Sequence, residues 1–378
     1  MRTKYLFYFC VGIGSIFDSQ VLALLNAISE KKVFKKVYLF LGIRNETQKN
    51  EILRKQVSSE IEIIYFKSYP NYPFFNFIQR KSISKAVKST NINFDEIIFH
   101  TRGELIAWHL SKVLNKEFYK NIIPDIRGAS VEEVREFFSQ NIVLKRLKIF
   151  NYKSALKTLY KFSKVSVVSK SLKDYLVSKY KIDPNNIVIT PSISDINFNF
   201  DKNKRNKIRK ELNLKDDDTL LVFSSGGTAN WQNNNVLAII ADNEFKVLNL
   251  SNKAIHHKNI INKFVSYSEM PSYLNAADAA IIWRDESIVN KVASPVKFSE
   301  YICCGLPVIS NYSVDMIKEY IIINSCGILI NSIDEIDSNT LKQLKQKDKQ
   351  AISEKGKVIY GIDTIANSYY QTYLSSGN

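Results

Sequence analysis

Residues 293–310 read ASPVKFSEYICCGLPVIS, and this stretch decides the predicted fold. Ser294 is a favoured N-cap residue and Pro295 a favoured first helical residue, while Gly305 suits the left-handed end of a helix. The apolar segment 307–310 follows directly and is typical of a short buried strand. The stretch therefore predicts a helix followed by a strand, the repeating unit of α/β proteins.

The same short helix carries two charges whose positions suggest a ligand. Lys297 lies in the first turn, where a cation is unfavourable at the positive end of the helix dipole unless an anion binds there. Free N–H groups at a helix N-terminus are a natural phosphate site. Glu300 lies three residues further on the same face, and its carboxylate could accept hydrogen bonds from a ribose diol. A solvent-exposed Lys–Glu pair explains this spacing equally well, so the residues alone leave both interpretations open.

Apolar segments and helical patterns alternate along the rest of the chain. The expected strands are 5–11, 36–41, 61–66, 96–100, 118–123, 164–169, 186–190, 220–224, 245–250 and 279–283. The expected helices are 18–29, 104–113, 172–180, 204–214, 273–277 and 364–374. Such alternation implies parallel sheets with helices on both faces. With 378 residues, we expect two doubly wound Rossmann-like domains, with ligands at strand ends in the crevice between them.

The composition limits the possible partners. The formal net charge of +16 implies an anionic partner, such as a nucleic acid, a membrane surface or a phosphorylated small molecule. The four cysteines form no Cys-x-x-Cys pair, and we expect reduced core residues of a cytoplasmic protein. The apolar run 5–17 passes directly into a helical pattern, so we expect a first core strand there rather than a signal peptide.

Several segments resemble one enzyme family, in the family's own order. They are FCVGIGSIFDSQVLALLNAI (9–28), VSVVSKSLKDYL (165–176), NIVITPSISDINF (186–198), LLVFSSGGTANWQ (220–232) and EMPSYLNAADAAIIWRDESIVNKVASPVKFSEYICCGLPVIS (269–310). Together they resemble the retaining glycosyltransferases of family 4, which have the GT-B fold. The resemblance implies transfer of a sugar from a nucleotide-sugar donor, UDP- or GDP-linked, with retention at the anomeric carbon and without a metal or other cofactor.

The resemblance also implies a domain organisation. We expect an acceptor-side domain over residues 1–199 and a nucleotide-sugar-binding domain over 200–355. The final segment, 356–378, is expected to form a helix that packs back on the first domain. Residues 195–203, which show no clear period, are typical of the linker between the two.

By this resemblance the donor site lies on the second domain. Glu300 would bind the ribose, and Lys297 would act on the diphosphate together with the helix end that Ser294 and Pro295 begin. Two glycines at the end of the first strand of that domain would let the backbone approach a phosphate closely. These are Gly226 and Gly227.

The sequence departs from the family in two places. Family members carry a further glutamate eight positions before the ribose-binding one, but Val292 stands there, and we expect Asn290 or the nearby backbone to substitute. The usual Arg and Lys after the first strand of the second domain are also absent. Arg284 is the expected replacement, because a cation there would stabilise the leaving diphosphate. The alternative for Arg284 is a surface salt bridge with Asp285 or Glu286.

Polar residues and glycines also follow the expected strands of the first domain. His100 is a candidate for donor-sugar contact or proton transfer, and a buried structural histidine is the alternative. For Asp125 and Arg127 the alternative is a local Asp–Arg pair. For Gly12 and Gly14 the alternative is a tight turn. The acceptor-side candidates are Gly12, Gly14, Arg102, Asp125 and Arg127.

A basic region suggests a membrane partner. Residues 137–173 contain nine Lys or Arg residues and no Asp or Glu. Lysines at 153, 157, 161 and 164 recur at helical spacing, which predicts a basic amphipathic helix on an anionic membrane. A solvated surface is the alternative. We expect no nucleic-acid binding, because no recognition module is visible.

These features together predict a cytoplasmic enzyme, peripheral on the inner face of the plasma membrane. It would extend a lipid-linked glycan in surface polysaccharide biosynthesis, such as capsule, O-antigen or lipopolysaccharide. Two alternatives remain: a nucleotide-sugar 2-epimerase of the same fold, and a catalytically silent module that binds nucleotide sugars or membranes.

Overall fold

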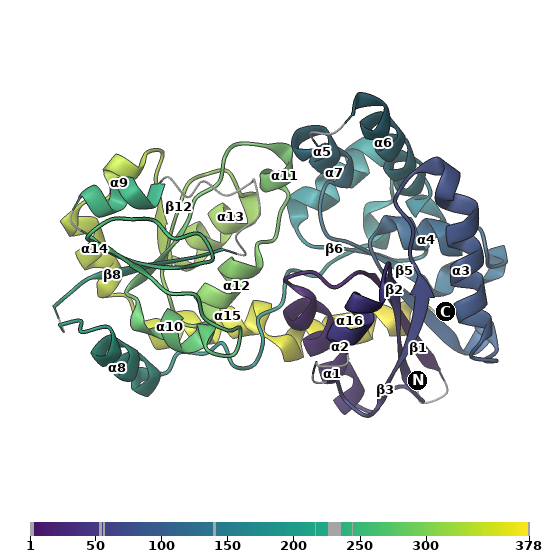
Figure 1. The fold of residues 1–378 in the computed structure, drawn as a ribbon, viewed down its shortest axis with the longest axis horizontal. Helices are drawn as coiled ribbons and strands as arrows, with labels where there is room; N and C mark the ends of the chain where they lie inside the picture. The colour runs from purple at the N-terminus through teal and green to yellow at the C-terminus, as the bar shows by residue number, and fades with distance from the viewer. Residues whose placement is uncertain are drawn as a thin grey trace. The chain divides into compact units, whose positions relative to one another are not determined.

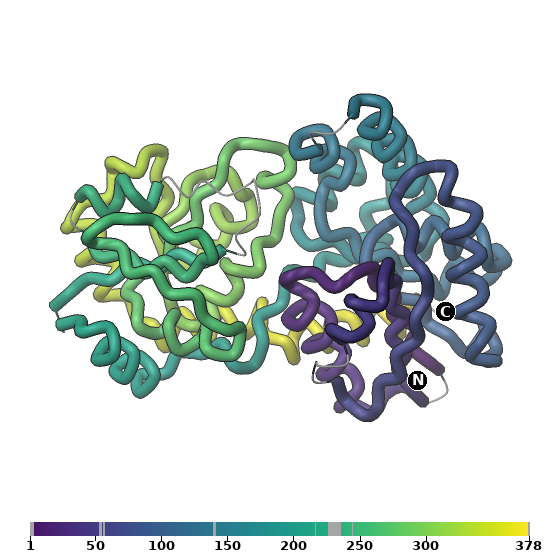
Figure 2. The backbone as a smooth tube through the Cα atoms, in the orientation of Figure 1, coloured from purple at the N-terminus to yellow at the C-terminus, as the bar shows by residue number. Residues whose placement is uncertain are grey.

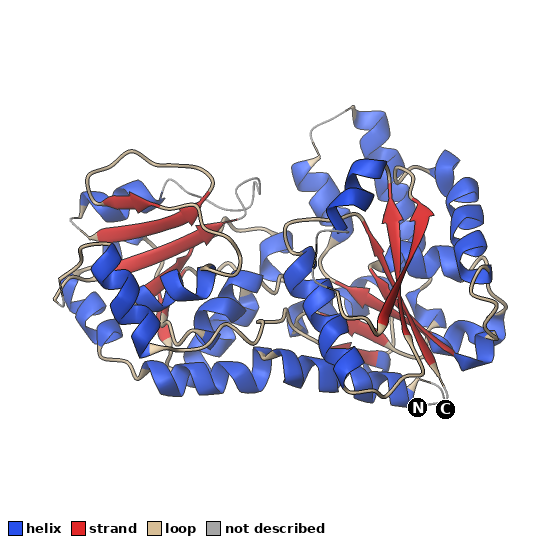
Figure 3. Cartoon of the chain, turned by 60° about the horizontal axis from the view of Figure 1, so that its bottom comes forward, coloured by secondary structure: helices blue, strands red, loops and turns tan. Residues whose placement is uncertain are grey.

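The computed structural model describes residues 4–52, 55, 57–138, 141–215, 217–225, 236–243 and 245–376. The chain divides into two compact units (Figure 1). Unit 1 comprises Met1–Pro191 together with Ile365–Asn378, and unit 2 comprises Ser192–Thr364. Each unit contains one parallel sheet between helices (Figure 3), so the predicted fold class of two Rossmann-like domains is confirmed.

The sheet of unit 1 has seven strands in the order β3-β2-β1-β4-β5-β6-β7, and neighbouring strands are parallel. The strands are β1 (Tyr5–Val11), β2 (Val37–Ile43), β3 (Ile61–Lys67), β4 (Ile97–Arg102), β5 (Ile122–Ile126), β6 (Val165–Val167) and β7 (Ile187–Ile189). The helices of unit 1 are α1 (Ala23–Glu30), α2 (Glu46–Ile52), α3 (Asn76–Lys88), α4 (Glu104–Leu110), α5 (Ser130–Phe137), α6 (Ile142–Leu156), α7 (Lys170–Tyr180) and most of α16 (Ile362–Ser375). A π-helical turn, Asp18–Leu22, leads into α1.

Strand β1 shows why this sheet is buried on both faces. Phe7 and Phe9 point to one face, where each contacts the ring of Phe40 on β2. Tyr8 points to the other face and stacks on His100 of β4, with ring centroids 4.4 Å apart. A continuous apolar run is the pattern expected of a central parallel strand.

The last helix, α16, covers the second of these faces. Tyr369 and Tyr373 are fully buried, and both rings contact the His100 ring. The yellow end of the chain accordingly lies beside the purple N-terminal elements of unit 1 in Figure 2. The prediction that the C-terminal helix returns to the first domain is therefore confirmed.

The sheet of unit 2 has six strands in the order β10-β9-β8-β11-β12-β13, again parallel throughout. The strands are β8 (Leu220–Ser225), β9 (Lys246–Ser251), β10 (Ile260–Asn262), β11 (Ala279–Ile282), β12 (Val308–Ser310) and β13 (Gly327–Leu329). The helices are α8 (Lys202–Glu211), α9 (Val236–Asp242), α10 (Met270–Ala276), α11 (Ile288–Lys291), α12 (Val296–Cys303), α13 (Asp315–Asn324), α14 (Ser338–Lys345) and α15 (Lys349–Tyr360). Ala280 and Ile282 of β11 join one core cluster and Ile281 joins the other, as the two-residue period of a strand requires.

The boundaries between the two units fall at different residues from those predicted. Unit 2 begins at Ser192 rather than after residue 199, because the Ser192 N–H donates to Ser294 Oγ at 2.9 Å and Phe198 is buried in the unit 2 core. Unit 2 also keeps helix α15, and the chain rejoins unit 1 at Ile365 rather than at residue 356. Gly356 allows α15 to pack closely on α12, since a Cβ there would lie 2.6 Å from Ile302 Cγ2.

Two local predictions are wrong. The strand expected at 118–123 is a 3-10 turn, Lys116–Asn121, and β5 begins only at Ile122. The basic helix expected at 153–164 ends at Leu156, so its four lysines do not share a helical face. The apolar residues between those lysines serve the core instead, since Leu156, Leu159 and Phe162 are buried.

The four cysteines are buried and unpaired by disulfides, as expected. Among the described residues, no helix combines the length and the apolar character needed to cross a bilayer.

Candidate functional site

Each sheet reverses its strand order at one point, and such points bind ligands in open α/β sheets. In unit 1 the point lies between β1 and β4, and in unit 2 between β8 and β11. The carboxyl ends of these strands border a cavity in each unit. The two units therefore present one candidate site each.

Helix α12 begins one residue later than predicted. Pro295 is the N-cap, with extended backbone angles, and no side chain caps the helix. Ser294 is consequently not the N-cap, and its hydroxyl instead accepts the Ser192 N–H. Gly305 follows the helix with a φ of 76°, as predicted, and a Cβ there would lie 2.3 Å from the Lys349 carbonyl oxygen. The start of α12 thus has no side-chain cap, and its far end is fixed by close packing.

Lys297 and Glu300 form an ion pair on α12. Lys297 Nζ lies 2.8 Å from Glu300 Oε2, and the Glu300 side chain is 1% exposed while that of Lys297 is 24% exposed. Burial raises the pKa of Glu300, and the Lys297 charge opposes that change. The pair is therefore not the solvent-exposed one that the sequence left open.

Arg284 is a buried cation directly after β11. It is 9% exposed, and burial lowers its pKa to about 10. Its Nη1 donates to Asn290 Oδ1 at 3.1 Å, whereas its Nε is buried without a hydrogen-bond partner. Within the described part of the chain no carboxylate lies within 4.0 Å of it, so the alternative of a salt bridge with Asp285 or Glu286 is not observed. A buried charge without a counter-ion is costly unless a ligand supplies one.

Asn290 holds Arg284 in place. Its side-chain oxygen accepts from Arg284, and its Nδ2 donates to the Asp285 carbonyl at 2.9 Å. Both the oxygen and the nitrogen of the Asn290 amide are therefore hydrogen-bonded, and Asn290 acts on the site by positioning Arg284. Val292, where the family's glutamate is missing, is buried.

A small cavity of about 10 Å³ joins these residues at the ends of β8 and β11. Arg284, Pro295 and Lys297 line it, together with Ser224 of β8. The backbone N–H of Ser224 donates to Tyr301 Oη at 2.7 Å, which ties β8 to α12. The predicted phosphate-binding glycines, Gly226 and Gly227, lie outside the described residues.

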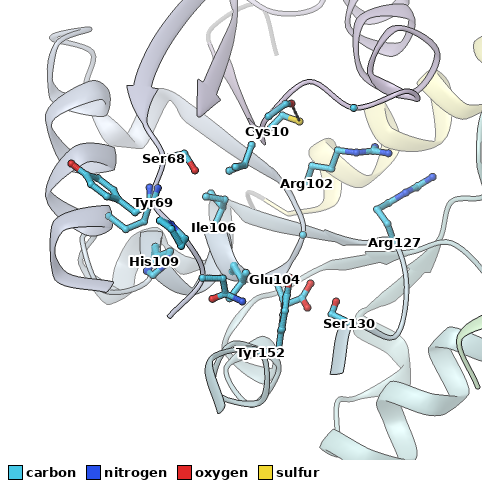
Figure 4. A pocket seen from close by; sticks show the side chains of 18 of the residues that line it. Cys10, Ser68, Tyr69, Arg102, Glu104, Ile106, His109, Arg127, Ser130 and Tyr152 are labelled. Carbon is cyan, nitrogen blue, oxygen red and sulfur yellow. Dashed lines mark hydrogen bonds between the residues drawn. The ribbon is translucent and has the colours of Figure 1, made fainter. Parts of the chain in front are cut away.

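The cavity in unit 1, which we call the unit 1 cavity, is much larger, about 510 Å³ (Figure 4). Four predicted acceptor-side residues line it: Gly12, Gly14, Arg102 and Arg127. Figure 4 shows the Arg102 and Arg127 side chains pointing the same way, away from Tyr69 and His109. Glu104, Ser130 and Tyr152 gather at another part of the wall.

Asp125, the fifth predicted acceptor-side residue, lies behind this wall rather than in it. It is fully buried, its Oδ1 accepts from Ser166 Oγ at 3.0 Å, and Arg127 Nη1 lies 3.4 Å from the same atom. Burial alone would raise the pKa of Asp125, but the nearby Arg127, His100 and Arg102 lower it well below its usual range. The local Asp–Arg pair is thus what the structure shows, and Asp125 orients cations of the cavity.

His100 has the surroundings of a buried structural histidine, which is the alternative that the sequence left open. Its ring is fully buried, and Nδ1 lies 2.7 Å from Tyr373 Oη. Burial lowers the pKa of His100, so the imidazole is neutral near neutral pH. The histidine joins β4 to α16, and it does not line the cavity.

The sequence patterns did not identify three buried polar residues of the cavity wall: Gln79, Glu104 and His109. Glu104 could have been found, because it follows β4 directly, where strand-end residues face ligands. Gln79 lies on α3, which the hydrophobic periodicity did not predict. Among the described residues, no three His, Cys, Asp or Glu side chains are grouped to hold a metal ion.

Comparisons with known proteins agree with this architecture. Residues 225–372 match the sequence model of the family described as Glucosyltransferase 3-like, C-terminal domain. No curated protein matches the chain in sequence.

Several solved structures are similar over nearly the whole chain. Sucrose-phosphate synthase from Thermosynechococcus elongatus has a TM-score of 0.70 and 14% identity, covering 98% of each chain. HepE from Anabaena, solved in complex with UDP, has a TM-score of 0.67 and 13% identity over 98% of this chain and 100% of its own. WaaG, a glycosyltransferase involved in lipopolysaccharide biosynthesis, has a TM-score of 0.65 and 11% identity over 99% and 100%. At these identities the similarity shows the fold, and the chain has the GT-B fold.

Proposed function

We propose that this chain is a glycosyltransferase that uses a nucleotide-sugar donor held by unit 2. The proposal rests on Arg284, a buried cation near the point where the unit 2 sheet reverses its strand order. Among the described residues this cation has no counter-ion. A diphosphate would supply that counter-ion. HepE, which shares the fold, has been solved with UDP and with UDP-glucose, and the family matched by residues 225–372 is named for a glucosyltransferase.

The residues of unit 2 then have distinct roles. Arg284 and Lys297 stabilise the negative charge that develops on the leaving diphosphate, which is the largest single contribution in many such reactions. Asn290 positions Arg284, and Glu300 accepts hydrogen bonds from the ribose hydroxyls. The donor is UDP- or GDP-linked, and transfer proceeds with retention, without a metal ion or other cofactor.

The acceptor is a lipid-linked glycan held by unit 1, and the enzyme works at the inner face of the plasma membrane in surface polysaccharide biosynthesis. WaaG, a protein of this fold, is involved in lipopolysaccharide biosynthesis. Helix α6, within the basic region, supports membrane contact. Ile142, Arg146 and Phe150 are exposed at four-residue intervals on this helix, so an apolar and basic stripe faces outward.

A transfer assay tests this function. The full-length protein is incubated with labelled UDP- and GDP-sugars and a membrane extract as the source of acceptor, and labelled glycolipid and free nucleotide are measured. The proposal that the chain is a glycosyltransferase is supported if nucleotide release requires the extract and is at least about a hundredfold slower in Arg284→Met. Lys291→Ala is the matched control, because Lys291 is exposed on neighbouring helix α11.

The other outcomes separate the alternatives. Arg284-dependent nucleotide binding without any transfer would indicate the silent module. Conversion of the donor to an epimer without an acceptor would indicate the 2-epimerase. Either result would contradict the proposed function.

A further inference from the structure

The backbone carbonyl of Arg284 accepts two side-chain hydrogen bonds from a single loop. This loop, residues 311–313, follows strand β12 and precedes helix α13. Asn311 Nδ2 donates to the carbonyl oxygen at 2.6 Å, and Ser313 Oγ donates to it at 2.8 Å. Because a carbonyl oxygen has two lone pairs, the two donors together can use both of them.

The sheet of unit 2 places this loop beside Arg284. Ile282 of β11 pairs with Ser310 of β12, and each is the last residue of its strand, so the two parallel strands end at the same level. Arg284 lies two residues beyond the first strand, and the loop follows the second strand directly. The contact therefore lies at the carboxyl edge of the sheet, next to the small cavity that Arg284 lines.

Arg284 is consequently held at both of its ends. The loop holds the backbone carbonyl, while Asn290 Oδ1 accepts from the guanidinium group at 3.1 Å. Asn290 is itself fixed, because its backbone N–H donates to Ser287 Oγ and its Nδ2 donates to the Asp285 carbonyl. A free arginine side chain is among the most flexible in proteins. A cation held in this way needs little reordering when an anion binds to it.

The loop makes these two hydrogen bonds at the expense of others. Asn311 Oδ1 is buried and has no hydrogen-bond partner in the part of the chain that the structure describes. Ser313 precedes Val314, the N-cap of α13, and that helix begins without a side-chain cap although serine is a favoured capping residue. An unmade buried hydrogen bond and an uncapped helix both cost stability. Local costs of this kind are expected at functional sites.

We propose that Asn311 and Ser313 are positioning residues of the donor site, which hold the Arg284 cation where the diphosphate of the donor binds. This rests on the proposed function, because the two residues act on the donor only through Arg284. Neither residue lines the cavity. Their effect is therefore confined to the affinity that the protein gains from the diphosphate.

Calorimetric titration of the full-length protein tests this inference. The ligands are UDP and GDP, each compared with its nucleoside, and the measured quantity is the ratio of the nucleoside Kd to the nucleotide Kd. We expect this ratio to fall about threefold or more in Asn311→Ala and in Ser313→Ala, and about tenfold or more in the double variant. Nucleoside binding is expected to stay as in the wild type, which shows that the site is folded.

A double-mutant cycle with Arg284→Met separates positioning from a purely structural role. In the Arg284→Met background, the Asn311→Ala and Ser313→Ala pair is expected to change the ratio by less than about twofold, because the cation that the two residues position is no longer present. A purely structural role would instead weaken nucleoside and nucleotide binding together, and by the same factor in both backgrounds.

Tyr312→Phe is the matched control, because Tyr312 lies between the two positioning residues in the same loop. Its side chain is 45% exposed, and its Oη lies 3.5 Å from the Leu329 carbonyl oxygen rather than near Arg284. This variant is expected to show the wild-type ratio. The single variants carry the same comparison should the double variant not fold.

The possible results separate the inference from the proposed function. A fall in the ratio that requires Arg284 supports the inference. An unchanged ratio in the Asn311 and Ser313 variants, or an equal fall in the Arg284→Met background, overturns it while leaving the donor site standing. A wild-type ratio near one, or a ratio that Arg284→Met does not alter, would instead count against the proposed function.

Discussion

Lys297 Nζ lies 2.8 Å from Glu300 Oε2, and the carboxylate is almost completely buried while the ammonium still reaches solvent. The buried Glu300 carboxylate therefore depends on Lys297 for its stability more than Lys297 depends on Glu300. Removal of Lys297 leaves a buried carboxylate uncompensated, whereas removal of Glu300 leaves a cation that water can still solvate. This asymmetry distinguishes a built site from a pair on the surface.

Lys297→Met is accordingly expected to destabilise the protein more than Glu300→Gln does. We expect a loss of about 3 kcal/mol in the free energy of unfolding for the first and about 1 kcal/mol for the second. Urea denaturation of both variants measures the difference. Equal losses, or a larger loss for Glu300→Gln, would show that burial of the carboxylate does not govern the pair.

Glu104 gives stability a pH dependence that can be isolated by substitution. Its pKa is about 7 in the folded protein, above the ordinary value of 4.5. The folded state therefore binds the proton more tightly, and this group stabilises it less as the pH rises from about 5 to about 8. The nearby Glu133, whose pKa burial also raises, titrates in the same direction, and its charge helps to raise the pKa of Glu104.

Glu104→Gln removes the ionisation, so it is expected to stabilise the protein relative to the wild type by up to about 3 kcal/mol near pH 8 and by much less near pH 5.5. Chemical denaturation at the two pH values measures this. A difference between the two proteins that is the same at both pH values would contradict a buried, titrating carboxyl group.

Tyr373→Phe tests the attachment of helix α16 to unit 1. The substitution removes only the hydroxyl that lies 2.7 Å from His100 Nδ1, in a fully buried setting. It leaves the imidazole nitrogen without a partner, which is expected to cost about 1–3 kcal/mol. Exchange of the backbone amide hydrogens of α16 is expected to accelerate in line with this loss of stability. Unchanged stability and exchange would show that the tyrosine ring alone secures the helix.

The exposed stripe of α6 predicts binding to anionic bilayers. The variant with Ile142→Ser, Arg146→Glu and Phe150→Ser is expected to lose most of its co-sedimentation with phosphatidylglycerol vesicles, and wild-type binding is expected to fall as salt is added. Phe264→Ser in unit 2 is the matched control, because Phe264 is 81% exposed but lies outside the basic region. Equal loss in the control would indicate nonspecific hydrophobic adsorption.

Elements with strong local signals were predictable from the sequence. The apolar run of β11, and the glycine after α12, specify a strand and a helix end without help from distant residues. The resemblance located Arg284, Lys297 and Glu300, and the structure brings these side chains to one end of the unit 2 sheet.

What escaped prediction depends on contacts made far along the chain. Strand β5 contains Pro124, which lacks an N–H donor and argues against a strand in any local pattern. The role of His100 depends on Tyr373, 273 positions away. Gln79 is polar and yet buried on α3, so it weakens the helical periodicity that would have revealed both the helix and the cavity.

The most direct test of the central claim is calorimetric titration of UDP and GDP, each against its nucleoside, into wild-type protein and Arg284→Met. If Arg284 binds the diphosphate, the wild type binds one nucleotide at least about a hundredfold more tightly than the nucleoside, and Arg284→Met loses that preference. If the variant binds the nucleotide as tightly as the wild type, Arg284 does not bind the diphosphate, and the proposed donor site is wrong.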